Sequence, residues 1–221
     1  NFPVKTGDKI AGTRIIPLVI EEEKMQKACE VAGKEPIFQI LPYQKKKAGI
    51  VTTGSEVYYH RIEDKFTPVV IDKLKECGVT EVKQIQCNDD HEMITEAIQT
   101  LIEDGFDLII CTGGMSVDPD DRTPLAIKNA CTEVVTYGAP VLPGAMFMLA
   151  YCEKEGRQIP VMGLPGCVMY AKRTIFDLVL PRIMCDEKLH EKDFRLLGQG
   201  GLCLSCPVCT FPNCGFGKGG Y

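Results

Sequence analysis

The sequence predicts an α/β fold, a three-layer α/β/α sandwich built around a mostly parallel sheet. From residue 48 onward, short apolar runs alternate with amphipathic helical patterns, which is the order expected of strands joined by crossover helices. The links between these segments are short. The run Asp107–Cys111 is continuously apolar after its first residue, as expected of a strand that is buried on both faces. With 221 residues, the chain has room for one such domain and an appendage.

Residues 1–47 are expected to form a small, partial β-rich domain and a linker. Lys9–Ile20 alternates weakly and ends in an apolar run, which favours a strand, whereas Glu21–Lys34 is charged and typical of a helix. Two prolines and the run Lys45–Lys47 mark the boundary to the next domain. Because the sequence does not begin with Met, we expect it to be part of a longer protein.

The main α/β domain is predicted over residues 48–185. Gly49–Thr52 is a short apolar strand. A helix is expected from Thr67, as its N-cap, to the stop signal Gly78. Val79–Cys87 is predicted to be the next strand.

The rest of this domain continues the alternation of helix and strand. A second helix follows Asp90 and ends at Gly105, with apolar residues on one face. Another begins at Thr123 after the buried strand. Three strands and a long helix complete the pattern, at Glu133–Tyr137, Met146–Cys152, Ile159–Met162 and Val168–Met184, the last ending near Pro181.

Composition excludes several classes of function. The net charge of −5 argues against a nucleic-acid binder, which needs a basic face. No apolar run approaches the ~20 residues that span a bilayer, so we expect no membrane segment. Eight of the 12 cysteines are scattered singly through apolar positions, which is typical of reduced thiols in a cytoplasmic protein.

Three glycine turns directly follow predicted strands. They are Thr53-Gly54-Ser55, Thr112-Gly113-Gly114 and Gly163-Leu164-Pro165-Gly166. Parallel strands place such turns at one edge of a sheet, where ligands bind in open α/β folds. Each turn alone is explained by chain geometry, but the three together, two of them with hydroxyl groups, indicate a ligand that carries a phosphate.

Carboxylates follow the same strand ends. Asp89 and Asp90 come after the second strand, and Asp118, Asp120 and Asp121 lie beside Gly113-Gly114. Mg²⁺ prefers one or two carboxylates together with substrate phosphates, so these residues predict a metal–phosphate site. The alternatives are an N-cap at Asp89, closed by Glu92 as a capping box, and a solvated acidic loop at 118–121.

The last part of the chain, 186–221, is expected to be a Gly/Cys-rich tail. Cys203, Cys206, Cys209 and Cys214 fall within 12 residues, a spacing close to that of bacterial iron–sulfur proteins. Four thiolates could equally hold Zn²⁺. We therefore predict a metal or cluster site here, with a disordered tail, or disulfides formed during purification, as the alternatives.

Five spaced motifs, in the same order, make residues 48–184 resemble the molybdopterin-binding domain. That domain occurs in molybdopterin adenylyltransferase and in molybdopterin molybdenumtransferase, the metal insertase. The motifs are Thr53-Gly-Ser-Glu-Val57, Asn88-Asp-Asp90, Asp107-Leu-Ile-Ile-Cys-Thr-Gly-Gly-Met-Ser116, Asp121-Arg-Thr-Pro124 and Gly163-Leu-Pro-Gly166. Residues 1–47 resemble the insertase segment that precedes this domain, through Gly7-Asp8 and Ala11–Leu18.

The resemblance implies a ligand, cofactors and roles for residues. The ligand would be molybdopterin or its adenylylated form, used with Mg²⁺ and with ATP or molybdate, in a domain that assembles as a homo-oligomer. Asp90 and Asp121 match the functional aspartates of the family, and with Asp118 they would hold Mg²⁺ or position the reacting group. The remaining matches would contact the pterin and its phosphate: Thr53, Gly54, Ser55, Gly113, Gly114, Ser116, Pro143, Gly144, Gly163, Pro165 and Gly166.

Two classes of function follow from this resemblance. The first is an enzyme that performs Mg²⁺-dependent nucleotidyl or molybdenum transfer on molybdopterin. The second is a non-catalytic carrier or sensor of molybdopterin with a metal-binding tail. The insertase has Asn-Pro after Gly163-Leu-Pro-Gly166, whereas this chain has Cys167-Val168. The loop from Asp118 to Pro124 also resembles the nucleotide-processing domain of competence-damage-type proteins.

Overall fold

The computed structural model describes residues 3–16 and 18–219. The chain divides into two compact units, one ending at Pro42 and one beginning at Tyr43. In the first unit, α1 (Glu22–Ala32) confirms the predicted helix. The predicted β-rich character of this unit is wrong, since residues 3–16 and 18–42 contain no strand. The apolar side chains Leu18 and Val19 are 85% and 84% exposed. A strand at this position would therefore bury no apolar face, and the burial that stabilises a sheet is missing.

The second unit is built on a six-stranded sheet. Its order is β2-β1-β3-β6-β5-β4. The neighbours β2, β1, β3 and β6 pair in parallel, and β5 is antiparallel to both its neighbours, β6 and β4. The strands are β1 (Lys47–Thr53), β2 (Glu81–Cys87), β3 (Leu108–Thr112), β4 (Glu133–Tyr137), β5 (Met148–Lys154) and β6 (Arg157–Leu164).

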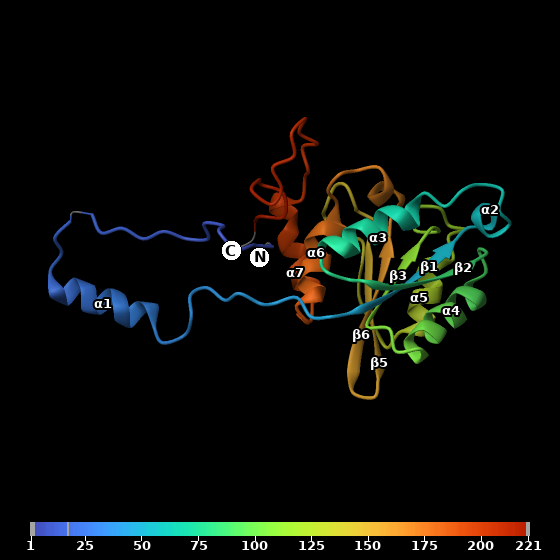
Figure 1. The fold of residues 1–221 in the computed structure, drawn as a ribbon, viewed down its shortest axis with the longest axis horizontal. Helices are drawn as coiled ribbons and strands as arrows, with labels where there is room; N and C mark the ends of the chain where they lie inside the picture. Colours follow the sequence, from blue (N-terminus) through green and yellow to red (C-terminus); the bar gives the residue numbers. More distant parts are fainter. Residues whose placement is uncertain (1–2, 17, 220–221) are drawn as a thin grey trace. The chain divides into compact units, whose positions relative to one another are not determined.

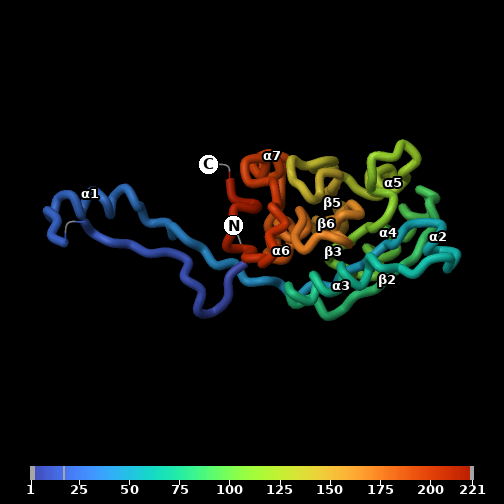
Figure 2. The backbone as a smooth tube through the Cα atoms, turned by 90° about the horizontal axis from the view of Figure 1, so that it is seen from above, coloured from blue at the N-terminus to red at the C-terminus, as the bar shows by residue number. Residues whose placement is uncertain are grey.

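Helices cover both faces of this sheet. One apolar core lies between the sheet and the helices α3 (Phe66–Glu76) and α6 (Ile175–Met184). The other lies between the sheet and α4 (His91–Glu103) and α5 (Thr123–Ala130). Figures 1 and 2 show α3 and α5 on opposite sides of the strands. The three-layer α/β/α prediction is confirmed.

Several helix boundaries differ from the prediction. The expected helix over Val168–Met184 is divided into a 3₁₀ turn, η1 (Gly166–Met169), and α6. α6 begins after Thr174, which forms a capping box with Asp177. Pro181 lies inside α6 and does not end it.

The first helix of the domain also begins differently from the prediction. Thr67 lies inside α3, and the Asp64 carboxylate accepts the N–H bonds of Phe66 and Thr67. Burial alone would raise the pKa of Asp64. Its hydrogen bonds from Thr67, Gln84 and Phe66 outweigh that effect and hold the pKa below its usual value.

A buried ion pair fixes the start of α6 against α3. Lys73 Nζ lies 2.6 Å from Asp177 Oδ1, and both residues are less than 10% exposed (9% and 7%). Arg173 and the Thr174 N–H also donate to this carboxylate. Because every charge here has a partner, the pair can be buried without a large net cost.

The C-terminal tail contains ordered elements, in contrast to the disordered tail that was the alternative to a metal site. It contains α7 (Glu191–Leu196) and η2 (Leu197–Gly200). Phe194 of α7 is buried and stacks on Phe147, with ring centroids 5.9 Å apart. In both views the segment after α7, drawn in red, lies beside α6 and α7 (Figures 1 and 2). Within the described parts of the chain, no helix is long and apolar enough to cross a membrane.

Candidate functional site

The three glycine turns meet at one edge of the sheet, as predicted. The strands β1, β3 and β6 run parallel, and their register places Thr52 opposite Thr112, and Thr112 opposite Leu164. Their carboxyl ends are therefore level. The turns at Gly54, Gly113 and Pro165 leave the sheet side by side, in the position where open α/β sheets bind ligands.

An aspartate–serine pair holds the turn after β1. The Asp89 carboxylate oxygen Oδ2 accepts two hydrogen bonds from Ser55, one from its N–H and one from its hydroxyl, both of 2.8 Å. Asp89 comes from the loop after β2, so the pair ties two neighbouring strand ends together. Asp89 was a candidate for the N-cap of the helix that follows, but Asp90 is the residue in that position.

Asp90 is the N-cap of α4. Its Oδ1 accepts the N–H bonds of Glu92, at 2.8 Å, and Met93, at 3.2 Å. The N–H groups of Met93 and Glu92 stabilise the ionised carboxylate, so the pKa of Asp90 lies below its ordinary value. β2 runs parallel to β1, so Asp90 lies at the same edge as the glycine turns, and the bonds to α4 use only one of its oxygens.

A second aspartate–serine pair holds the turn after β3. Asp121 Oδ2 accepts the Ser116 N–H at 2.5 Å and the Ser116 hydroxyl at 2.7 Å. Asp118 belongs to the same loop and donates its N–H to Ser116 Oγ at 3.2 Å. Burial and the negative charge of Asp121 raise the pKa of Tyr137, which places this tyrosine close to the loop.

Gly113 and Gly114 can only be glycines in this arrangement. Both have positive φ, +87° and +54°. A Cβ on Gly113 would collide with the carbonyl oxygen of Thr53, and one on Gly114 would lie 2.7 Å from the Thr123 hydroxyl. The Thr123 hydroxyl also donates to the Gly113 carbonyl at 2.9 Å.

Thr53 packs against this turn from the interior of the protein. It is 5% exposed, and its hydroxyl lies 3.2 Å from that of Thr123. The side chain therefore faces the protein interior, where it braces the Gly113 turn. Gly163 also faces the protein interior, because a Cβ there would lie 2.6 Å from the Met115 methyl group.

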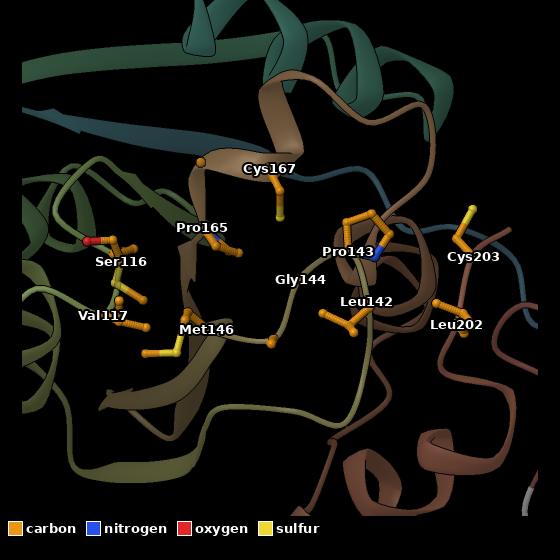
Figure 3. A pocket seen from close by; sticks show the side chains of 13 residues that line it. Ser116, Val117, Leu142, Pro143, Gly144, Met146, Pro165, Cys167, Leu202 and Cys203 are labelled. Atoms are coloured by element: carbon orange, nitrogen blue, oxygen red, sulfur yellow. The ribbon is translucent and has the colours of Figure 1, made fainter. Parts of the chain in front are cut away.

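A cavity of about 560 Å³ opens beside the second turn (Figure 3). Five predicted contact residues line it: Ser116, Pro143, Gly144, Pro165 and Gly166. Sequence reasoning missed the apolar and sulfur-bearing part of the lining, which is Met115, Val117, Leu142, Ala145, Met146, Cys167, Leu202 and Cys203. Two of these residues had a sequence signal: Cys167 is a departure from the insertase, and Cys203 was predicted as a metal ligand and not as part of this lining.

The lining is held by tight packing. Gly144 has φ +128°, and a Cβ there would lie 2.8 Å from the Ile175 Cβ at the start of α6. Cys167 points into the space between Pro165 and Pro143 (Figure 3). Burial raises the pKa of the Cys167 thiol, although backbone hydrogen bonds partly oppose the rise. Cys167 is therefore a neutral, weakly polar group near neutral pH.

The predicted metal ligands are not gathered into one cluster. Within residues 3–16 and 18–219, no three His, Cys, Asp or Glu side chains converge as a metal site would require. Cys206 and Cys209 are exposed, whereas Cys203 and Cys214 are half-buried. A Zn²⁺ or iron–sulfur site needs four thiolates together, so this arrangement does not fit one. Mg²⁺ needs only one or two carboxylates when phosphates supply the rest.

A family model described as a probable molybdopterin binding domain matches residues 49–184 of the chain. Among curated relatives, a CinA-like protein of Mycobacterium tuberculosis (strain H37Rv) is 35% identical over 85 residues. A CinA-like protein of Mycobacterium avium (strain 104) is 34% identical over 95 residues. These matches cover 38% and 43% of this chain but only 20% and 22% of the relatives.

Two solved structures share the fold. A putative molybdenum cofactor biosynthesis protein from Corynebacterium diphtheriae aligns with a TM-score of 0.52 at 15% identity, over 65% of this chain and 98% of its own. The molybdopterin biosynthesis enzyme MoaB from Thermus thermophilus aligns with a TM-score of 0.52 at 18% identity, over 62% of this chain and 91% of its own. At such identities the likeness concerns the fold alone.

Proposed function

Because this chain belongs to the family of probable molybdopterin binding domains, which matches its residues 49–184, we propose that it binds molybdopterin at the carboxyl edge of its sheet. One observation carries the proposal. Two serines at neighbouring strand ends, Ser55 and Ser116, are each held by an aspartate through both the N–H and the hydroxyl. Such doubled bonds fix the serines before any ligand arrives.

The direction of these hydrogen bonds suits a metal–phosphate ligand. Each serine hydroxyl gives its hydrogen to an aspartate, so the Ser55 oxygen can accept or coordinate through its lone pairs. The Ser116 oxygen accepts the Asp118 N–H and keeps one lone pair for a ligand. The serine bonds use only Oδ2 of Asp89 and of Asp121, so each carboxylate has a second oxygen for a cation. The neighbouring glycine backbones can approach a phosphate closely.

Mg²⁺ fits this donor set. Asp121, with Asp118 in the same loop, would hold the ion together with phosphate oxygens of the ligand. Asp90 lies at the end of β2, with β1 between it and β3, and would position the reacting group. When bound, Mg²⁺ would neutralise charge on the phosphate and on a transferring group. The residues of the chain would do the remaining work, which is to position the pterin phosphate against its partner and to stabilise charge without a covalent nucleophile.

The proposal is tested by the affinity for molybdopterin with and without Mg²⁺, measured by anaerobic isothermal titration calorimetry. Asp121→Ala removes the acceptor of two hydrogen bonds and a metal ligand, so we expect a loss of about tenfold or more in the Mg²⁺-dependent affinity. Asp104→Ala is the matched control. Asp104 pairs with Lys83 at the opposite edge of the sheet, and its replacement should leave affinity unchanged. Equal affinities for both variants and the wild-type protein would contradict the proposal.

The catalytic step is nucleotidyl or molybdenum transfer to the bound pterin. Single-turnover mixtures of stoichiometric protein and molybdopterin, with MgATP or with molybdate, would show adenylylated molybdopterin or the molybdenum-loaded product. Retained binding without either product would support the carrier or sensor function in place of the enzyme. The CinA-like relatives favour a further alternative, the nucleotide processing that the loop from Asp118 to Pro124 also resembles. Conversion of a nucleotide in the absence of molybdopterin would support that alternative.

A further inference from the structure

The cysteine-rich tail makes one wall of the cavity. A parallel β-bridge joins Leu202 to Leu142. The Leu142 N–H donates to the Gly201 carbonyl at 2.7 Å, and the Cys203 N–H donates to the Leu142 carbonyl at 2.8 Å. Gly201 is buried, and a Cβ there would collide with the Pro140 carbonyl oxygen. This segment is therefore fitted to the 140–142 backbone and is not lying loosely on the surface.

Residues further along the tail anchor it to α6. Phe216 is 4% exposed and belongs to the core between α6 and the sheet. Phe211 packs against Phe216, and the Arg173 guanidinium lies 5.0 Å from the Phe211 ring centroid. The Gly217 N–H closes back on the Gly200 carbonyl at 2.8 Å. The segment between these anchors has little freedom to leave the cavity.

The family match ends at residue 184, so Leu202 and Cys203 lie outside it and yet line the cavity (Figure 3). Three large apolar side chains at this cavity are more than half exposed: Val117 at 81%, Leu142 at 58% and Leu202 at 61%. Apolar groups gathered around a small-molecule-sized cavity are typical of a ligand surface.

We infer that Leu202 and Cys203 are ligand-contacting residues, and that the tail completes the binding site. The inference rests on the proposed function. The phosphate end of molybdopterin lies on the glycine turns, and its pterin ring with the two dithiolene sulfur atoms lies in the cavity. Apolar carbon and soft sulfur atoms, including Cys167 and Met146 opposite the tail, suit such a ring system better than they suit a phosphate.

The test compares neighbouring residues of the full-length protein. Leu202→Ala removes an apolar contact and should weaken molybdopterin binding about fivefold. Leu204→Ala is the matched control, because Leu204 is 76% exposed and does not line the cavity. Circular dichroism and thermal melting would show that both variants fold like the wild-type protein.

Hydrogen–deuterium exchange provides an independent readout. Molybdopterin should slow exchange in peptides that contain Leu142 and Cys203, whose amides form the bridge, and should leave peptides around Cys206 and Cys209 unchanged. Retained binding with equal affinities for both leucine variants and no protection at Cys203 would overturn the inference and leave the proposed function standing. Failure of the wild-type protein to bind molybdopterin at all would instead overturn the proposed function, and the inference with it.

Discussion

The turns that follow β1 and β3 use the same pair of residue types and are supported differently. In both turns an aspartate accepts the N–H and the hydroxyl of a serine. Behind the second turn, Gly113 is wedged against Thr53 and bonded by the buried Thr123. Gly54 in the first turn has open space around its Cβ position.

Exposure follows the same division. Asp89 is exposed and Asp121 is half-buried, and only the second turn contributes a serine to the cavity. The same aspartate–serine pair therefore serves two purposes. The second turn is a fixed part of the binding surface, whereas the first has room to adjust when a ligand binds.

The largest expected effect comes from the glycines of the two turns. Gly113→Ala would force a Cβ into the Thr53 carbonyl at a positive φ, so we expect a loss of about 3 kcal/mol or more in the free energy of unfolding. Gly54→Ala meets only the strain of φ +132°, at about 1–2 kcal/mol. Urea denaturation followed by circular dichroism measures both. Equal losses would show that the two turns are equally constrained.

Much of this edge was predictable from the sequence. Glycines after short apolar runs located all three turns, and parallel topology then required them to meet. The hydrogen-bond partners of the aspartates were not predictable. Asp89 and Asp90 have the same chemistry, and only the local path of the backbone decides which of them caps α4. The start of α6 had a readable signal, the Thr174-x-x-Asp177 capping box.

The tail and the N-terminal unit show where sequence reasoning fails. Four cysteines at regular spacing predicted a metal site, whereas the tail backbone is held by its bridge to Leu142, a residue distant in sequence, and by the burial of Phe216. The apolar run ending at Ile20 predicted a strand, although a strand needs a neighbouring strand and a face to bury. Both outcomes depend on packing between residues that are distant in sequence, which local patterns do not record.

The next largest expected effect is the coupling free energy between the aspartate and the serine of each pair. Double-mutant cycles with Ser116→Ala and Asp121→Ala should give a coupling of about 1 kcal/mol in the free energy of unfolding. The same cycle with Ser55→Ala and Asp89→Ala should give only a few tenths of a kcal/mol, because water competes for the exposed carboxylate. A larger coupling at Ser55 would reverse the assignment of the fixed and adjustable turns.

The smallest expected effect concerns Asp90, which follows the aspartate of the first turn. Its pKa is lowered in the folded state by the N–H groups of Met93 and Glu92, so ionised Asp90 stabilises the fold above its unfolded pKa of about 3.9. That contribution is lost as the pH falls through the folded-state pKa. The stability difference between the wild-type protein and Asp90→Ala, from urea denaturation, should therefore shrink between pH 6 and pH 3. A difference that stays constant with pH would mean that the ionised carboxylate adds nothing to the cap of α4.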